Sequence, residues 1–193
     1  MRYGAKYLRW APITEETAAA LPTYGEAIGL GELNRLSDNP TFSEAKAYGD
    51  DMLARYVKEF REVPVDVEIL DIENQKAATI TGAKLEEGVG VKFSSGDNAP
   101  YGGLGFYAAT LNKANEKHYQ GVFYAKLKAN MVGEEYTTKG ESISLSNQKL
   151  QFMGTACACG IWKILSPEFV TETEAKNWVD GILSGSVKPE VSV

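Results

Sequence analysis

The sequence predicts a mainly β fold, of the α+β kind, that ends in one amphipathic helix. Two segments alternate apolar and polar side chains with the period of two that a half-buried strand requires. The first places on one face Val63, Val65, Val67 and Ile69, and the second, from Val122 to Met131, places on one face Phe123, Ala125, Leu127, Ala129 and Met131. Near the C-terminus, Thr171 to Glu174 match a capping box. We expect the helix from Thr171 to Leu183 to pack Trp178, Val179 and Ile182 against the sheet.

Length and composition predict one soluble domain. A chain of 193 residues can bury one substantial core and is short for two, so we expect a single domain over residues 1–193, with 184–193 as a flexible or partner-dependent tail. No apolar stretch approaches the ~18 to 20 residues that span a bilayer, and the N-terminus lacks the apolar core of a secretory signal. A protein made in the cytosol is therefore expected.

The charge balance argues against tight binding of nucleic acid. Lysine and arginine number 20 against 26 aspartates and glutamates, which leaves a net charge of −6 and no basic patch. Affinity for a phosphate backbone comes largely from cations that displace counterions. An acidic surface would instead let a polyanion slide past without being held.

The first forty residues predict short elements separated by turns. Gly4 to Trp10 mixes aromatic and basic residues and is interpreted as an edge strand. Thr14 to Ala20 is expected to be a short helix or a loop, and Leu21 to Gly25 a turn. Ala27 to Leu36 follows as a strand that is bent or bulged because it contains two glycines. Ser37 to Pro40 supplies the next turn.

The segment from Phe42 to Phe60 is open to two interpretations. An apolar stripe at i, i+3, i+4 and i+7 favours a helix and consists of Leu53, Tyr56, Val57 and Phe60. The alternative is a long hairpin of Phe42–Tyr48 and Met52–Glu59 that turns through Gly49, Asp50 and Asp51. The residue pattern alone favours neither.

The second half predicts one short helix and several strands. Asn74 to Thr81 is expected to be helical and to end at Gly82, where glycine adopts a left-handed conformation easily. Gly88 to Gly105 is expected to be a long loop. A hairpin should then form from Leu104–Leu111 and His118–Met131. A last strand, Glu141 to Phe152, changes phase and predicts a bulge near Asn147.

No pattern of reactive residues predicts catalysis, a metal site or a cofactor. His118 is the only histidine, which argues against nucleophile relays and multi-histidine metal sites. Cys157 and Cys159 would point to one face of a strand, and their spacing is too short for a zinc knuckle, so they are interpreted as small core or surface residues. Glycines at 88, 90, 102, 103 and 105 lack the spacing of a phosphate-binding loop. The acidic doublets are expected to be solvated, and the chain is not expected to be an enzyme.

The order and spacing of these segments resemble the major tail proteins, or tail tube proteins, of long-tailed phages (siphoviruses) that infect Gram-positive bacteria. The matching segments cover most of residues 1–183. They are Tyr3–Trp10, Ala27–Leu36, Phe42–Tyr48, Gly49–Asp51, Val63–Ile72, the short helix that ends at Gly82, Gly105–Tyr107, Tyr119–Leu127 and Thr138–Leu145. The resemblance favours the hairpin over the helix for residues 42–60.

This resemblance implies a β-sandwich or partly open β-barrel with a flanking helix, and a structural role in the virion. Six copies would form a ring, and stacked rings would conduct DNA from capsid to host through a lumen that does not bind it tightly. Implied partners are further copies of the chain and the tape measure, tail terminator and distal tail proteins, with assembly in the host cytoplasm and no membrane contact.

In this interpretation the hairpin reaches a neighbouring subunit or ring. The residues expected to make that contact are Phe42, Glu44, Lys46, Tyr48, Asp50, Asp51, Arg55 and Lys58. An alternative function is a β-sandwich adhesion or carbohydrate-binding module without catalytic activity.

Overall fold

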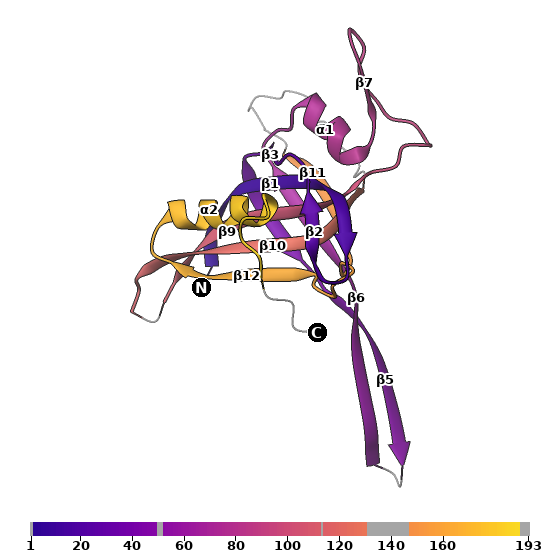
Figure 1. Cartoon of the computed structure of the whole chain (residues 1–193), viewed down its shortest axis with the longest axis vertical. Coiled ribbons are helices and arrows are strands. Elements are labelled where there is room, and N and C mark those ends of the chain that lie inside the picture. The colour runs from indigo at the N-terminus through magenta and orange to yellow at the C-terminus, as the bar shows by residue number, and fades with distance from the viewer. Residues whose placement is uncertain (1, 50–51, 113, 131–146, 190–193) are drawn as a thin grey trace, which may run out of the picture.

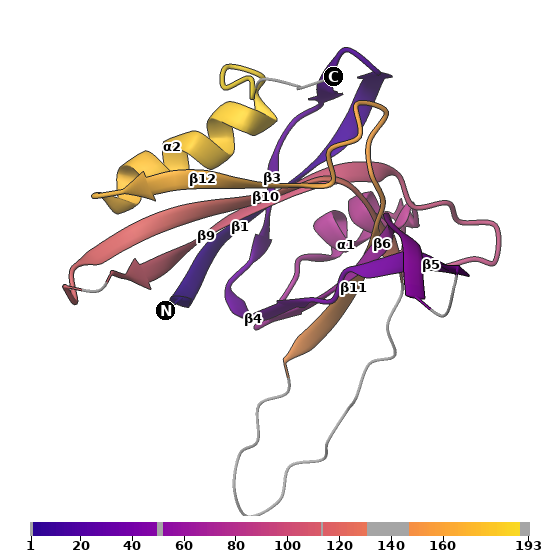
Figure 2. The same ribbon diagram turned by 90° about the horizontal axis from the view of Figure 1, so that it is seen from below.

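The computed structural model describes residues 2–49, 52–112, 114–130 and 147–189. Most of its strands belong to one antiparallel sheet, in which hydrogen-bonded neighbours follow the order β2-β1-β9-β10-β11-β6-β4. The sheet bends around a buried interior, and a C-terminal helix covers part of its outer face (Figures 1 and 2). The predicted fold class, mainly β with a flanking helix and an extended hairpin, is confirmed.

The elements have the following bounds. The strands of the first half are β1 Arg2–Thr17, β2 Ala20–Tyr24, β3 Ile28–Gly31, β4 Leu33–Asp38, β5 Thr41–Gly49 and β6 Met52–Ile69. The remaining elements are α1 Asn74–Thr81, β7 Lys84–Glu86, β8 Gly90–Lys92, β9 Tyr101–Leu111, β10 Lys117–Asn130, β11 Gln148–Gly154, β12 Lys163–Phe169 and α2 Glu172–Leu183.

β1 is an interior strand, so the prediction of an edge strand was wrong. It pairs with β9 on one side and with β2 and β3 on the other. The predicted helix or loop at Thr14–Ala20 and the predicted turn at Leu21–Gly25 are also wrong, because these residues form the β1–β2 hairpin. A register shift on β2 between Ala20 and Thr23 accommodates Pro22, which has no amide hydrogen to donate to a regular ladder.

β10 is the strand from which the sheet divides, as Figure 2 shows. One edge pairs with β9 along its length, while the other pairs first with β12 and then with β11. A bulge between Tyr124 and Leu127 shifts the alternation by one residue at this change of partner. Tyr124 and Leu127 therefore face the same interior, whereas Phe123 lies under α2. The prediction that Phe123 and Leu127 share a face was wrong for this reason.

The main core lies between the two halves of the bent sheet. The alternation predicted for β6 is confirmed, since Val63, Val65, Val67 and Ile69 are at most 1% exposed. They pack with Trp10, Leu104, Phe152 and other apolar side chains. This part of β6 pairs with β4 along one edge and with β11 along the other.

A second, smaller core lies beneath α2. The capping box is confirmed: the Thr171 hydroxyl accepts from the Glu174 amide, and the Glu174 carboxylate accepts from the Thr171 amide. Val179 and Ile182 are buried in this core, and Trp178 is half-buried beside it. Trp178 lies over Gly121, where an added Cβ would come within 2.3 Å of the indole ring.

Other predicted elements have adjusted bounds. The helix Asn74–Thr81 is confirmed, with Gly82 in a left-handed conformation at φ 72°. Ala27–Leu36 divides into β3 and β4 at Gly31, which has φ 128° and lies so near Asp71 that a Cβ would collide with its carbonyl oxygen. The predicted loop at 88–105 contains β8 and the start of β9. Residues 141–146 of the last predicted strand, and Met131, lie outside the described residues.

Candidate functional site

The most prominent feature of the surface is a hairpin that we call the arm, defined as residues 41–49 and 52–62. β5 pairs with β6 from Gly49–Met52 at its far end to Thr41–Glu62 at its base. Among the described strands, β5 has no other partner. At ~3.3 Å per residue, the β6 part of the arm is roughly 35 Å long. Figure 1 shows it projecting from the body, away from α1 and β7.

The register of the arm assigns its side chains to two faces, because directly opposed residues share a face. The first face carries Phe42, Glu44, Lys46, Tyr48, Leu53, Tyr56, Lys58 and Phe60. The second carries the smaller β5 residues Ser43, Ala45 and Ala47, opposite Glu59, Val57 and Arg55. Apolar and charged side chains are mixed on both faces. A two-stranded ribbon of this kind has no core of its own and is marginally stable alone.

Charged groups on the first face are held by weak surface contacts. Lys58 Nζ lies 3.3 Å from Glu44 Oε1 and 4.4 Å from the centre of the Phe42 ring. A hydrogen bond from Tyr56, and then one from Lys58, lower the pKa of the Glu44 carboxyl. Exposed pairs of this type contribute little stability because water and salt screen them. They orient the side chains of the arm without burying them.

The far end of the arm exposes large apolar side chains. Tyr48 is 70% exposed, Met52 72% and Leu53 53%, and Tyr56 and Val57 are about half exposed. Tyr48 and Leu53 are directly opposed in the register. Contiguous exposed apolar side chains on a protein surface mark interaction sites. The arm therefore has the composition of a surface that another molecule covers.

The base of the arm is fixed to the body by aromatic side chains. The rings of Phe60 and Trp162 stack with centroids 4.7 Å apart and an interplanar angle of 8°. The Phe42 ring meets Phe60 edge to face at 6.0 Å. Because Trp162 directly precedes β12, this contact joins the base of the arm to the segment that leads into β12.

A partly buried polar cluster lies just before the arm, at the end of β4. Asp38 accepts a 2.7 Å hydrogen bond from the Tyr124 hydroxyl and a further bond from Lys163 Nζ. Burial opposes ionisation of Asp38, but the bonds from Lys163 and Tyr124 outweigh it, and the pKa of the carboxyl is lowered. β4, β10 and β12 are thereby linked where the chain leaves the body for the arm.

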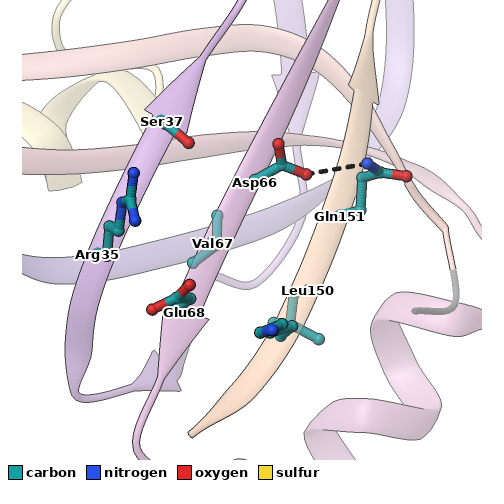
Figure 3. Close-up of a pocket in the computed structure, with 8 residues that line it drawn as sticks. Arg35, Ser37, Asp66, Val67, Glu68, Leu150 and Gln151 are labelled. Atoms are coloured by element: carbon teal, nitrogen blue, oxygen red, sulfur yellow. Dashed lines mark hydrogen bonds between the residues drawn. The ribbon is translucent and has the colours of Figure 1, made fainter. Parts of the chain in front are cut away.

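A polar face covers the outside of β4, β6 and β11 (Figure 3). Two cross-strand rows form it: Arg35, Glu68 and Lys149, and Ser37, Asp66 and Gln151. Gln151 donates a 2.9 Å hydrogen bond to Asp66. Val67 and Leu150 from the same strands point the other way, into the core. The carboxylates occupy the central strand and the cations flank them.

The structure places most of the predicted contact residues on the arm. Phe42, Glu44, Lys46, Tyr48 and Lys58 share the first face, and Arg55 lies on the second. Asp50 and Asp51 lie outside the described residues.

Sequence reasoning left out the exposed apolar residues of β6. These are Met52, Leu53, Tyr56 and Val57, of which the last three were part of the alternative helical stripe. The sequence does contain a signal for them: no turn residue separates Met52 from Val63, which indicates one continuous strand.

Residues considered for chemistry lie apart from the arm. His118 Nε2 lies 3.4 Å from Asn112 Nδ2 and 3.9 Å from Glu116 Oε2, at the β9–β10 turn. The described residues contain no group of three or more histidine, cysteine, aspartate or glutamate side chains that could hold a metal ion. No helix in the described ranges has the length and apolar character needed to span a membrane.

The prediction that the acidic doublets are solvated was wrong for Glu16, whose side chain is partly buried. Glu16 lies 2.7 Å from Lys126 Nζ and accepts a hydrogen bond from the Ala158 amide. Burial opposes ionisation of Glu16, yet these bonds lower the pKa of its carboxyl.

Comparisons with known proteins give no family assignment. No protein-family model matches the chain, and no curated protein matches it with significance.

Proposed function

We propose that this chain is a structural subunit of a phage tail tube, forming stacked hexameric rings through which DNA passes. The single observation that supports this function most strongly is the arm. Its far end exposes Tyr48, Met52 and Leu53, and its only strand-pairing in the described residues is internal. A neighbouring copy that covers these side chains would remove an exposed ribbon edge that otherwise favours uncontrolled aggregation. In a closed symmetric ring, the same contact surface is covered on every subunit.

The base of the arm supports a role in assembly. An arm that passed between subunits has to hold one direction relative to the body, because a ring closes only at a fixed angle. The stacking of Phe60 on Trp162 and the continuity of β6 into the main core supply that rigidity. A flexible loop of the same composition would lose more entropy on binding.

The polar face of β4, β6 and β11 suits the lining of the bore. The two carboxylates of its central strand, Asp66 and Glu68, offset the charges of Arg35 and Lys149, which leaves no net positive charge available to phosphates. Few unpaired cations mean little counterion release when DNA approaches. DNA would therefore pass this surface without being retained.

The test of assembly compares the wild-type protein with an arm variant by electron microscopy and analytical ultracentrifugation. We expect tubes or rings from the wild type. The double substitution Tyr48→Ser and Leu53→Ser should abolish them while the circular dichroism spectrum and the melting temperature stay unchanged. The matched control is Val89→Ser, which alters a side chain that is 74% exposed at the β7–β8 hairpin. A wild-type protein that stays monomeric at high concentration, or a double variant that still forms tubes, would refute the proposal.

The bore assignment has a separate test on assembled tubes. Asp66→Lys with Glu68→Lys should leave tubes intact but make them retain double-stranded DNA in a nuclease-protection assay. Added salt should release that DNA, since the contact is electrostatic. Glu86→Lys with Glu87→Lys, at the exposed β7–β8 hairpin, changes the net charge by the same amount and is the control. Equal retention by the control and the double variant would show that the polar face does not line the bore.

A further inference from the structure

The connection between β11 and β12 contains a tight turn with two cysteines. The Gly160 amide donates to the Cys157 carbonyl oxygen at 2.8 Å, and the Cys157 amide donates to the Ile161 carbonyl oxygen at 3.0 Å. Gly160 has φ 83°, a left-handed conformation that favours glycine at the end of a turn. Cys157 and Cys159 therefore lie on a turn, and the prediction that they share the face of a strand was wrong.

The turn brings the two sulfur atoms into contact. Cys157 Sγ and Cys159 Sγ lie 2.9 Å apart, which is closer than the ordinary non-bonded contact of two sulfurs. Cys157 is buried and Cys159 is partly exposed, so a small reagent can reach the second thiol but not the first. A disulfide requires both sulfurs to approach with little movement of the backbone. Here the backbone hydrogen bonds of the turn already hold them together.

The surroundings of the pair differ from those of a catalytic thiol. Burial, and then the Cys159 thiol, raise the pKa of Cys157 above its usual range. Reactive cysteines of oxidoreductases have instead a lowered pKa from a cation or a helix N-terminus. The Ala158 amide between the cysteines donates to Glu16, so a carboxylate lies beside the turn. The pair therefore lacks the activated thiolate of a catalytic cysteine, and its oxidation depends on an external disulfide.

We propose that Cys157 and Cys159 are a reversible modification site that closes to an intramolecular disulfide on exposure to a small-molecule disulfide. The Cys159 thiolate attacks one sulfur of oxidised glutathione and releases one glutathione thiolate. The Cys157 thiolate then attacks Cys159 Sγ in the mixed disulfide and displaces the second glutathione. Two protein thiols lose two electrons and two protons, and two molecules of reduced glutathione are formed. This inference does not rest on the tail-tube proposal.

The position of the pair predicts a labile disulfide. Only one residue separates the cysteines, so the closed ring is small and strained, and strained disulfides are reduced more easily than structural ones. The chain-entropy gain of so short a loop is also small. Excess reduced glutathione should thus reopen the bond in the folded protein. The neighbouring Trp162, which stacks on Phe60, should keep its place because the sulfurs are already in contact.

The test uses the purified full chain in glutathione buffers of increasing oxidised fraction, followed by alkylation and intact-mass measurement. The reduced protein should take up two alkyl groups. The oxidised protein should take up none and be lighter by two hydrogens, and a proteolytic map should place the cross-link within residues 157–159. Excess reduced glutathione should restore both alkylation sites.

Two single variants serve as controls. Cys157→Ser and Cys159→Ser should each take up one alkyl group after reduction. In the oxidising buffer, Cys157→Ser should accumulate a glutathione adduct at Cys159, since no second thiol resolves it. Wild-type protein that remains alkylated on both thiols in oxidised glutathione alone, or that forms a stable double adduct or an intermolecular dimer in place of the internal bond, would overturn the proposal.

Discussion

Replacing Asp38 with alanine should destabilise the protein measurably, because it removes the carboxylate that accepts hydrogen bonds from Tyr124 and Lys163 in a partly buried cluster. The Asp38 side chain is 26% exposed and that of Lys163 19%, while Tyr124 is 1% exposed. The variant leaves the Tyr124 hydroxyl and the Lys163 ammonium without this acceptor. An unsatisfied buried hydroxyl costs about 1 to 3 kcal/mol, and breaking a buried ion pair costs about 3 to 5. Since both charged groups retain some solvent, we expect a loss of about 2 to 4 kcal/mol.

The loss can be measured by calorimetry and by urea denaturation. For a domain of this size, 1 kcal/mol corresponds to about 2 to 4 °C, so the melting temperature should fall by about 4 to 16 °C. Tyr124→Phe is the matched control, because it deletes one hydrogen bond and leaves the ion pair, at a cost of about 0.5 to 1.5 kcal/mol. An Asp38→Ala variant within about 0.5 kcal/mol of the wild type, the range of ordinary surface substitutions, would refute the reasoning.

The same cluster predicts a pH dependence with a definite sign. The folded-state pKa of Asp38 is lowered, since the bonds from Lys163 and Tyr124 outweigh the effect of burial. Its contribution to stability is therefore complete above the ordinary aspartate pKa of about 4 and is lost as the pH falls through the lower folded value. The difference in unfolding free energy between wild type and Asp38→Asn should be constant from pH 5 to 7 and shrink below pH 4. A difference that grows in acid would contradict the assignment.

Further substitutions probe three other parts of the fold. Thr171→Ala removes the capping box of α2 and should cost about 0.5 to 2 kcal/mol in urea denaturation; an unchanged midpoint would show that the cap is dispensable. Gly121→Ala places a methyl group 2.3 Å from the Trp178 ring and should cost about 1 to 3 kcal/mol. Adding Trp178→Leu should recover part of that loss, whereas strictly additive effects would argue against the contact. Phe60→Ala should speed amide exchange along the arm and leave exchange in the main core unchanged. If exchange in the arm is as slow in this variant as in the wild type, the stack of Phe60 on Trp162 does not fix the arm.

Local signals in the sequence predicted the elements whose determinants are local. The capping box at Thr171 and Glu174 and the glycine that ends α1 each act within one helical turn. The alternation from Val63 to Ile69 was also sufficient, because this part of β6 is buried on one face. In these cases the residues near one another in the chain carry the information.

Features set by distant partners could not be predicted in the same way. The bulge of β10 lies where the strand changes its neighbour from β12 to β11, and nothing between Tyr124 and Leu127 signals that change. Pro22 suggested a turn, yet the pairing of β2 with β1 absorbs it in an irregular register. The contact of Cys157 with Cys159 depends on the turn closed by Gly160.

β6 combines both situations within one strand, and this explains why the arm was ambiguous in sequence. Its C-terminal part has the β-branched alternation of a strand whose neighbours belong to the same chain. Its N-terminal part, from Met52 to Phe60, is rich in residues of high helix propensity, and pairing with β5 holds it extended. Strand preference depends largely on what packs against the side chains. An extended segment with exposed apolar side chains has the properties expected of a surface that a second chain covers, and this is the physical basis on which we propose that the arm takes part in assembly.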